Sequence, residues 1–157
     1  MTRWLTEHEL RAWLKLAGLM LKLGPTLDSQ LQRDSDLNHF DYLCLAMLSE
    51  NDERTRRMSE LAASTNSSLS RLSHVISKLE GRGWVERRPC PTSKRVTLVS
   101  LTDAGWDVLE KAAPGYVGTV RSLVFDDLPD DDVAALERIA GQILDRIEAA
   151  PDLDSRS

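Results

Sequence analysis

The sequence predicts a mainly helical fold with one small β-hairpin, an α+β class, and three observations lead to this prediction. Apolar residues recur three and four positions apart near both ends of the chain, as they do in amphipathic helices. Two short runs typical of strands, 84–88 and 96–101, flank a region that contains two prolines. The length of 157 residues suits one domain with helical extensions and excludes a large multidomain enzyme.

The N-terminal part of the chain predicts two amphipathic helices. The first begins near Thr6, and Gly24-Pro25 predicts a kink or a break into two helices, because proline lacks a backbone donor and clashes with the preceding turn. The second begins after Asn38, which forms a capping box with Asp41, and runs to about Glu50. The apolar stripe of the first helix comprises Leu10, Trp13, Leu14, Ala17, Met20, Leu21, Leu27 and Leu31.

The central part predicts an edge strand, two helices with a corner between them, and a hairpin. The strand is expected at 56–58, Ser59 is expected to cap the first helix, and Asn66 is the corner residue best able to adopt a left-handed backbone conformation. Ser68 is expected to cap the second helix, which ends at Gly81-Arg82-Gly83. A turn over 89–95 then joins the two strands. This order is that of a winged helix-turn-helix. The predicted buried stripe of the second helix is Leu69, Leu72, Val75, Ile76 and Leu79.

The C-terminal part predicts two further helices. One begins at Thr102-Asp103 and is expected to bend near Pro114-Gly115, and the last begins at about Asp130. Apolar residues of the last helix alternate in steps of three and four, so it is expected to pack along another helix. These residues are Val133, Leu136, Ala140, Ile143 and Ile147.

Charge is strongly segregated along the chain. The net charge is -5, yet the segment 54–95 holds ten basic and three acidic residues, a net charge of +7. Such a segment is able to bind a polyanion while acidic flanks discourage wrong contacts, although a solvated charged face is the other interpretation of charge alone.

The second helix of the central pair has the side chains that a DNA recognition helix needs. Small and hydrogen-bonding groups let a helix backbone approach the floor of the major groove, and an arginine there, Arg71, is able to bond the O6 and N7 atoms of guanine. For Ser68, capping of the helix is the alternative to a base contact. The expected base-reading set is Ser67, Ser68, Ser70, Arg71, His74 and Lys78.

The hairpin supplies a second expected contact with DNA, because cations near its tip reach phosphates or the minor groove. Phosphate contacts set affinity and salt sensitivity more than specificity. If roughly 6–10 phosphates are neutralised per dimer, the slope of log K against log salt is on the order of -5 to -9. The expected phosphate-contacting set is Arg56, Arg57, Arg87, Arg88, Lys94 and Arg95.

Four motifs stand in a characteristic order at 58–62, 68–72, 79–85 and 101–105. Together they resemble the MarR family (multiple antibiotic resistance regulators), and the resemblance extends over about residues 5–149. The wing departs from the family pattern, because Ser93-Lys94-Arg95 stands where Asp-x-Arg-Arg is common. The family's threonine before the last helix is replaced by Pro129, so Asp130 or Asp131 is expected to cap that helix.

The resemblance implies an obligate homodimer that holds two winged lobes over successive major grooves of a pseudo-palindromic double-stranded DNA operator. It implies one domain overall, with 1–36 as an N-terminal dimerisation helix, 37–101 as the winged helix-turn-helix DNA-binding region, 102–149 as C-terminal dimerisation helices and 150–157 as a tail. It also implies a repressor released by a small aromatic or anionic effector. The candidate lining of an effector site is Trp13, Ala17, Met20, His39, Tyr42 and Leu43.

The sequence argues against other classes of protein. Scattered histidines and the lack of a nucleophile or phosphate-loop motif argue against an enzyme, and no metal or cofactor is expected. No run is apolar enough to span a membrane, and the acidic start is unlike a signal peptide, so a cytoplasmic protein is expected. Cys44 is expected to be buried. Two alternatives stay open: a regulator switched by oxidation of Cys90, and a winged-helix module that binds protein.

Overall fold

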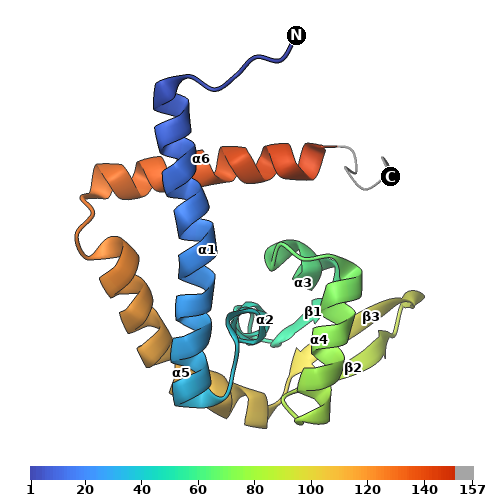
Figure 1. Ribbon diagram of the computed structural model, residues 1–157. Helices are drawn as coiled ribbons and strands as arrows, with labels where there is room; N and C mark the ends of the chain where they lie inside the picture. Colours follow the sequence, from blue (N-terminus) through green and yellow to red (C-terminus); the bar gives the residue numbers. More distant parts are fainter. Residues whose placement is uncertain (151–157) are drawn as a thin grey trace. The chain divides into compact units, whose positions relative to one another are not determined.

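The computed structural model describes residues 1–150, which fall into two compact units that divide after Thr119. The first unit contains a long helix, a small lobe built of helices and a three-stranded sheet, and most of the next helix, α5 (Figure 1). The second unit contains a short π-helical segment and the last helix. Residues 151–157 of the predicted tail lie outside the described residues. Mainly helical structure with a small antiparallel sheet confirms the predicted fold class.

Helix α1 (Glu7–Ser35) begins where the sequence predicts and continues further than expected. Thr6 caps it through a capping box with Glu9. Of the two alternatives predicted at Gly24-Pro25, a kink or a break, the break is wrong, because α1 continues through Pro25 as one helix. An internal proline costs a helix ~3 kcal/mol. The C-terminal turns of α1 offset this cost, since Leu27 and Leu31 are buried in the first unit.

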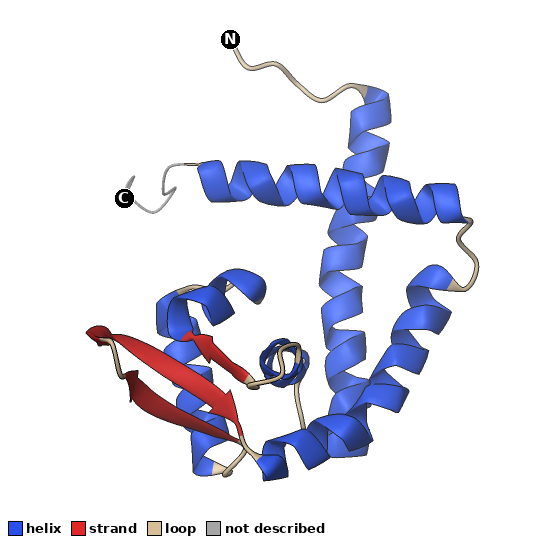
Figure 2. Cartoon of the chain, turned by 180° about the vertical axis from the view of Figure 1, so that it is seen from behind, coloured by secondary structure: helices blue, strands red, loops and turns tan. Residues whose placement is uncertain are grey.

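The lobe follows α1 in the order predicted. It comprises α2 (His39–Ser49), β1 (Thr55–Arg57), α3 (Met58–Ser64), α4 (Leu69–Gly81), β2 (Val85–Cys90) and β3 (Ser93–Leu101). The strands form an antiparallel sheet of order β1-β3-β2, so β1 is an edge strand as predicted. Figure 2 shows the hairpin of β2 and β3 reaching away from α1, with its tip at the outer edge of the lobe.

Caps and corners of the lobe largely follow the sequence. The capping box of Asn38 and Asp41 is confirmed, as are the left-handed conformation of Asn66, with φ of 51°, and the cap of α4 by Ser68. The predicted cap of α3 by Ser59 is wrong, because β1 leads directly into the helix. Arg57 occupies the cap position, and its backbone N–H donates to Glu60 at 3.4 Å.

The core of the first unit lies between the sheet, the lobe helices and α5. Leu72, Ile76 and Leu79 bury the inner face of α4, as predicted. The prediction that Leu69 belongs to this stripe is wrong, because its side chain in the first turn is 55% exposed and α4 enters the core only from Leu72 onward.

The hairpin is longer than predicted. Its turn was expected over 89–95, but β2 extends to Cys90 and β3 begins at Ser93. Pro89 is tolerated in the strand because β2 is an edge strand, where a missing N–H costs little pairing. A register shift between Pro89 and Cys90 leads into the short turn. Lys94 and Arg95 therefore lie on strand β3 itself, next to the tip.

Helix α5 (Asp103–Val120) joins the lobe to the C-terminal end of α1 and continues through Pro114. Its first turn packs tightly against the loop before β2. A Cβ atom at Gly105 would lie 2.1 Å from the carbonyl oxygen of Trp84, so glycine is required there. Farther along, Tyr116 reaches α2, where its hydroxyl lies 2.9 Å from Nε2 of His39.

The second unit consists of η1 (Arg121–Phe125) and α6 (Asp130–Ala149). The start of α6 is confirmed, but the predicted side-chain cap by Asp130 or Asp131 is wrong. Pro129 occupies the cap position, and no side chain accepts a capping bond. The aspartates lie in the first turn, where their charge favours the positive end of the helix dipole. Within residues 1–150, no helix is long and apolar enough to cross a membrane.

Candidate nucleic-acid interface

The N-terminal half of α4 presents the predicted base-reading residues on its exposed side. Ser70, Arg71 and His74 are exposed. The two serines before the helix use their hydroxyls locally, because Ser67 Oγ donates to the carbonyl of Ser68 at 3.0 Å, and Ser68 Oγ accepts from the backbone N–H of Arg71 at 3.2 Å. Capping therefore accounts for Ser68 in this structure.

Arg71 is held by an aromatic ring. Its guanidinium carbon lies 4.3 Å from the ring centroid of Phe40, which belongs to the first turn of α2. This cation–π contact places the guanidinium over the ring and uses none of its N–H donors. Among the described residues no acceptor bonds its N–H groups, so the donors at its edge are available to a ligand.

Lys78 has a different role from the one the sequence suggested. Its ammonium group lies 2.6 Å from Oδ1 of Asp41, a carboxylate that is only 3% exposed. Removing a partner from a buried carboxylate is costly, so this ion pair ties α4 to α2. Lys78 is thus not brought together with Arg71 as an available cation.

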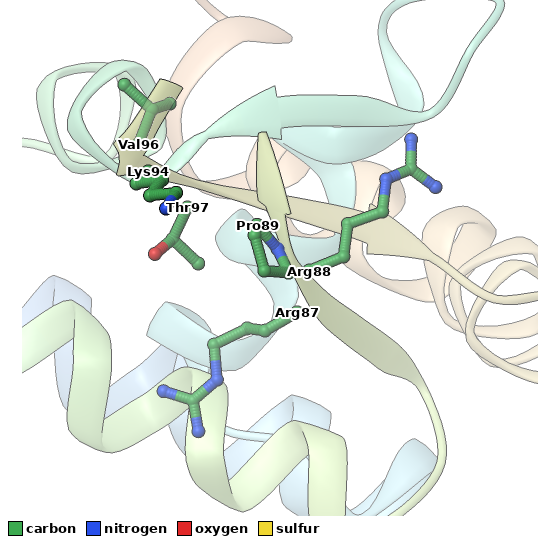
Figure 3. A pocket seen from close by; sticks show the side chains of 6 residues that line it. All are labelled: Arg87, Arg88, Pro89, Lys94, Val96 and Thr97. Carbon is green, nitrogen blue, oxygen red and sulfur yellow. The ribbon is translucent and has the colours of Figure 1, made fainter. Parts of the chain in front are cut away.

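The hairpin carries the second group of available cations. Arg88 and Lys94 line a shallow hollow of about 330 Å³ together with Arg87, Pro89, Val96 and Thr97. Figure 3 shows Arg87 and Arg88 extending in opposite directions from β2, with Lys94 on the neighbouring strand. Arg95 is exposed next to Lys94. Within residues 1–150, no acidic side chain pairs with Arg88, Lys94 or Arg95.

The other three predicted phosphate contacts are engaged within the fold. Arg56 donates to the carbonyl of Met47 and to Glu50, both at 2.7 Å, and Arg57 lies 4.0 Å from Glu60. Arg87 bonds Ser77 at 2.9 Å.

Arg87 also joins the wing to the recognition helix. Its side chain bonds Glu80 Oε1 at 3.1 Å, while its backbone N–H donates to Oε2 of the same carboxylate at 3.0 Å. These hydrogen bonds lower the pKa of Glu80. Arg87 therefore fixes strand β2 against the end of α4 and is not an available cation.

Ion pairing thus sorts the ten basic residues of segment 54–95 into two classes. Among residues 1–150, six of them pair with carboxylates, and four of the six carboxylates come from outside the segment, which reduces its effective charge. The six pairs are Arg54–Asp103, Arg56–Glu50, Arg57–Glu60, Lys78–Asp41, Arg82–Asp36 and Arg87–Glu80. The four remaining cations, Arg71, Arg88, Lys94 and Arg95, form what we call the free-cation set.

The candidate effector residues are only partly assembled within one chain. His39 and Tyr42 both contact Tyr116, whose ring centroid lies 4.0 Å from that of Tyr42, and sequence reasoning did not include Tyr116. The backbone N–H of His39 donates to Asp28 at 2.6 Å. Trp13 precedes Asp28 by fifteen positions on the same helix and therefore lies ~22 Å from it along the axis.

The other members of that set extend along α1 and α2. Ala17 and Met20 lie between Trp13 and the α2 contact, and Met20 is 59% exposed, while Leu43 is half-buried on α2. Burial lowers the pKa of His39 and raises the pKa of both Tyr42 and Tyr116. The two tyrosines and the histidine therefore favour their neutral forms.

The two cysteines lie in contrasting surroundings. Cys44 is buried as predicted, and burial raises the pKa of its thiol to about 12. Cys90 lies at the end of β2, where the hydroxyl of Thr92 at 3.3 Å lowers the pKa of its thiol. No group of three or more metal-ligating side chains occurs in the described part of the chain.

Known proteins are similar to this chain in sequence and architecture. The chain matches the family model described as MarR family over residues 37–97. The transcriptional repressor MprA of Escherichia coli (strain K12) is 24% identical over 120 residues, which cover 76% of this chain and 68% of that protein.

Two solved structures from Streptomyces coelicolor are similar over nearly the whole chain. Sco3205, a MarR family transcriptional regulator in complex with DNA, is 40% identical, with a TM-score of 0.87 and coverage of 91% of this chain and 89% of that chain. AbsC, also a MarR family transcriptional regulator, is 34% identical, with a TM-score of 0.88 and coverage of 95% and 100%.

Proposed function

Since the chain belongs to the MarR family of DNA-binding transcriptional regulators, we propose that it is a homodimeric repressor of a pseudo-palindromic operator. The observation that carries the proposal is the free-cation set. Its members lie on α4 and on the β2–β3 hairpin, the two elements that a winged helix-turn-helix directs at DNA, and they lack acidic partners in residues 1–150.

The four cations divide the work of binding. Arg71 reads a base in the major groove, with Ser70 and His74 beside it on α4, because its planar donors match the acceptors of guanine. Arg88, Lys94 and Arg95 contact phosphates and set affinity without reading sequence.

Exposed apolar side chains support the homodimer. On α1, Leu14 is 61% exposed and Leu21 is 76% exposed, and Trp13 lies on the same helix. Helix α6 separately exposes Leu136, Ile139 and Ile147. Exposing such apolar faces to water is unfavourable for a monomer, and a second copy of the chain would bury them.

Selection of bound duplexes from a random DNA pool, together with sedimentation of the free protein, tests the proposal. We expect a two-chain species and a selected sequence with two inverted half-sites about one helical turn apart. Arg71→Ala should relax the preference at one base pair of each half-site. A monomeric protein, or binding to DNA that is undetectable at low salt, would favour the alternative of a protein-binding winged-helix module.

Release by a small effector is the second part of the proposal. His39 and Tyr42, with Tyr116, supply aromatic surface and polar atoms where α1, α2 and α5 meet, and a second chain is needed to bring Trp13 near them. Titration of the protein–DNA complex with aromatic carboxylates tests this. We expect at least one of them to lower DNA affinity, and Tyr42→Phe, which keeps the buried ring, to weaken that response while leaving affinity in its absence unchanged.

A further inference from the structure

Two consecutive residues of α2 each hold one cation of α4. The ring of Phe40 lies under the guanidinium of Arg71, with 4.3 Å from carbon to centroid, and Oδ1 of Asp41 lies 2.6 Å from Nζ of Lys78. Arg71 and Lys78 are seven positions apart, which places them two turns apart on the same side of α4. The first turn of α2 therefore contacts the recognition helix at two points along one face.

The Asp41 contact ties α4 to the first turn of α2. Both oxygens of this buried carboxylate are used, since Oδ2 accepts from the backbone N–H of Asn38 at 3.3 Å in the capping box of α2. A carboxylate held in this way has little freedom to follow a moving partner. It holds the ammonium group of Lys78 against α2.

The Phe40 contact fixes how Arg71 is presented. Phe40 is half-buried and packs against the hydrophobic core, so its ring has a defined orientation. The contact with the ring uses none of the five N–H donors of the guanidinium, and the Arg71 side chain is exposed. Arg56 and Arg87, in contrast, spend their donors on protein acceptors.

We propose that Phe40 is a positioning residue for base discrimination, because it holds the guanidinium of Arg71 ready for a two-point contact with a base. This inference rests on the proposed function, in which Arg71 reads a base. An arginine that is already held loses less side-chain freedom when it binds, and a planar donor pair that is held at one angle discriminates better between bases.

Three single variants test the proposal in the full chain. Phe40→Met keeps a similar volume but removes the aromatic face, Phe40→Tyr keeps the face, and Arg71→Ala removes the cation. The measurements are affinities for the selected duplex, for duplexes changed at one base pair at a time, and for random-sequence duplex. Thermal unfolding and sedimentation of each variant establish that it is folded.

We expect Arg71→Ala to lower discrimination at one base pair about tenfold per half-site. Phe40→Met should lower discrimination at that same base pair about threefold per half-site, the worth of an exposed cation–π contact, and leave random-sequence affinity unchanged. Phe40→Tyr should behave like the parent protein. Phe40→Met should add nothing in the Arg71→Ala background, because the contact it disturbs is already absent.

Other results separate failure of the inference from failure of the proposed function. Phe40 is not a positioning residue, and the function stands, if Arg71→Ala loses discrimination and Phe40→Met does not. The same holds if Phe40→Met lowers the affinity for all duplexes equally. If Arg71→Ala leaves discrimination unchanged at every base pair, the proposed role of Arg71 is wrong. Should Phe40→Met be unfolded, Phe40→Leu replaces it, since leucine keeps a branched apolar side chain but lacks the aromatic face. Loss of discrimination with random-sequence affinity retained then supports the proposal, and unchanged discrimination overturns it.

Discussion

Replacing a free cation should weaken DNA binding, whereas replacing a paired cation by the same neutral residue should lower stability. Arg88→Gln removes a member of the free-cation set, whereas Arg56→Gln removes an arginine whose side chain is 23% exposed and bonded to Met47 and Glu50. Both variants change the charge of the chain equally, and both residues lie on the same sheet. Net charge alone therefore predicts the same loss of DNA binding for each variant.

The expected magnitudes follow from the number of phosphates contacted. Three wing cations per chain give six contacts in a dimer and a slope of log K against log salt of about -5, or about -7 if Arg71 also releases a counterion. Arg88→Gln removes two contacts per dimer, so its slope should be weaker by about 1.8. Arg56→Gln should leave the slope unchanged and lower the free energy of unfolding by about 1–2 kcal/mol, because the Met47 carbonyl loses its donor.

Fluorescence anisotropy with a labelled random-sequence duplex over a series of salt concentrations measures both slopes, and urea unfolding measures stability. Random-sequence DNA is the appropriate ligand, because phosphate contacts do not depend on knowing the operator. Equal changes of slope for Arg88→Gln and Arg56→Gln would refute the division of cations by their ion pairs. So would a slope for Arg88→Gln identical to that of the parent protein.

Three further predictions concern Lys78, His39 and the two cysteines. Lys78→Met should lower the thermal unfolding temperature by leaving the buried carboxylate of Asp41 without its cation, while the salt slope of DNA binding stays the same. Because burial lowers the pKa of His39, the unfolded state binds a proton at this residue more readily than the folded state does. The free energy of unfolding should therefore fall as the pH drops below 6.5, and it should fall less in His39→Gln. Urea unfolding over that pH range measures both. In the native protein a thiol reagent should modify Cys90 rapidly and Cys44 only on unfolding. If peroxide treatment abolishes DNA binding of Cys90→Ser as it does that of the parent protein, the oxidation-switched alternative fails.

Local signals in the sequence predicted most of the lobe. Caps at Asn38 and Ser68 and the left-handed corner at Asn66 depend on contacts within a few residues, and a reader of the sequence sees every participant. The start of α6 was predicted for the same reason. Its cap was not, because Pro129 takes the cap position without supplying a side-chain acceptor.

Features that depend on distant partners were not predicted. Pro25 does not break α1, since burial of Leu31 against the lobe outweighs a local cost, and Pro89 does not end β2, since the strand lies at the edge of the sheet. In both cases the local cost of proline is real, and tertiary contacts outweigh it. Which backbone donors and which side chains form tertiary contacts cannot be read from the sequence near each proline.

The candidate site shows the same limit in its charges. The acidic partner of Lys78 is 37 positions away in sequence and that of Arg82 is 46 positions away. A short window of sequence, of the length of one helix or hairpin, therefore contains only one member of each pair. A phosphate that recruited such a cation would have to displace a carboxylate, and for Lys78 that carboxylate is buried and would be left uncompensated. The same number of cations distributed over different acidic partners would give a different DNA surface. The placement of acidic residues such as Asp41 and Glu80 therefore selects which cations remain for DNA.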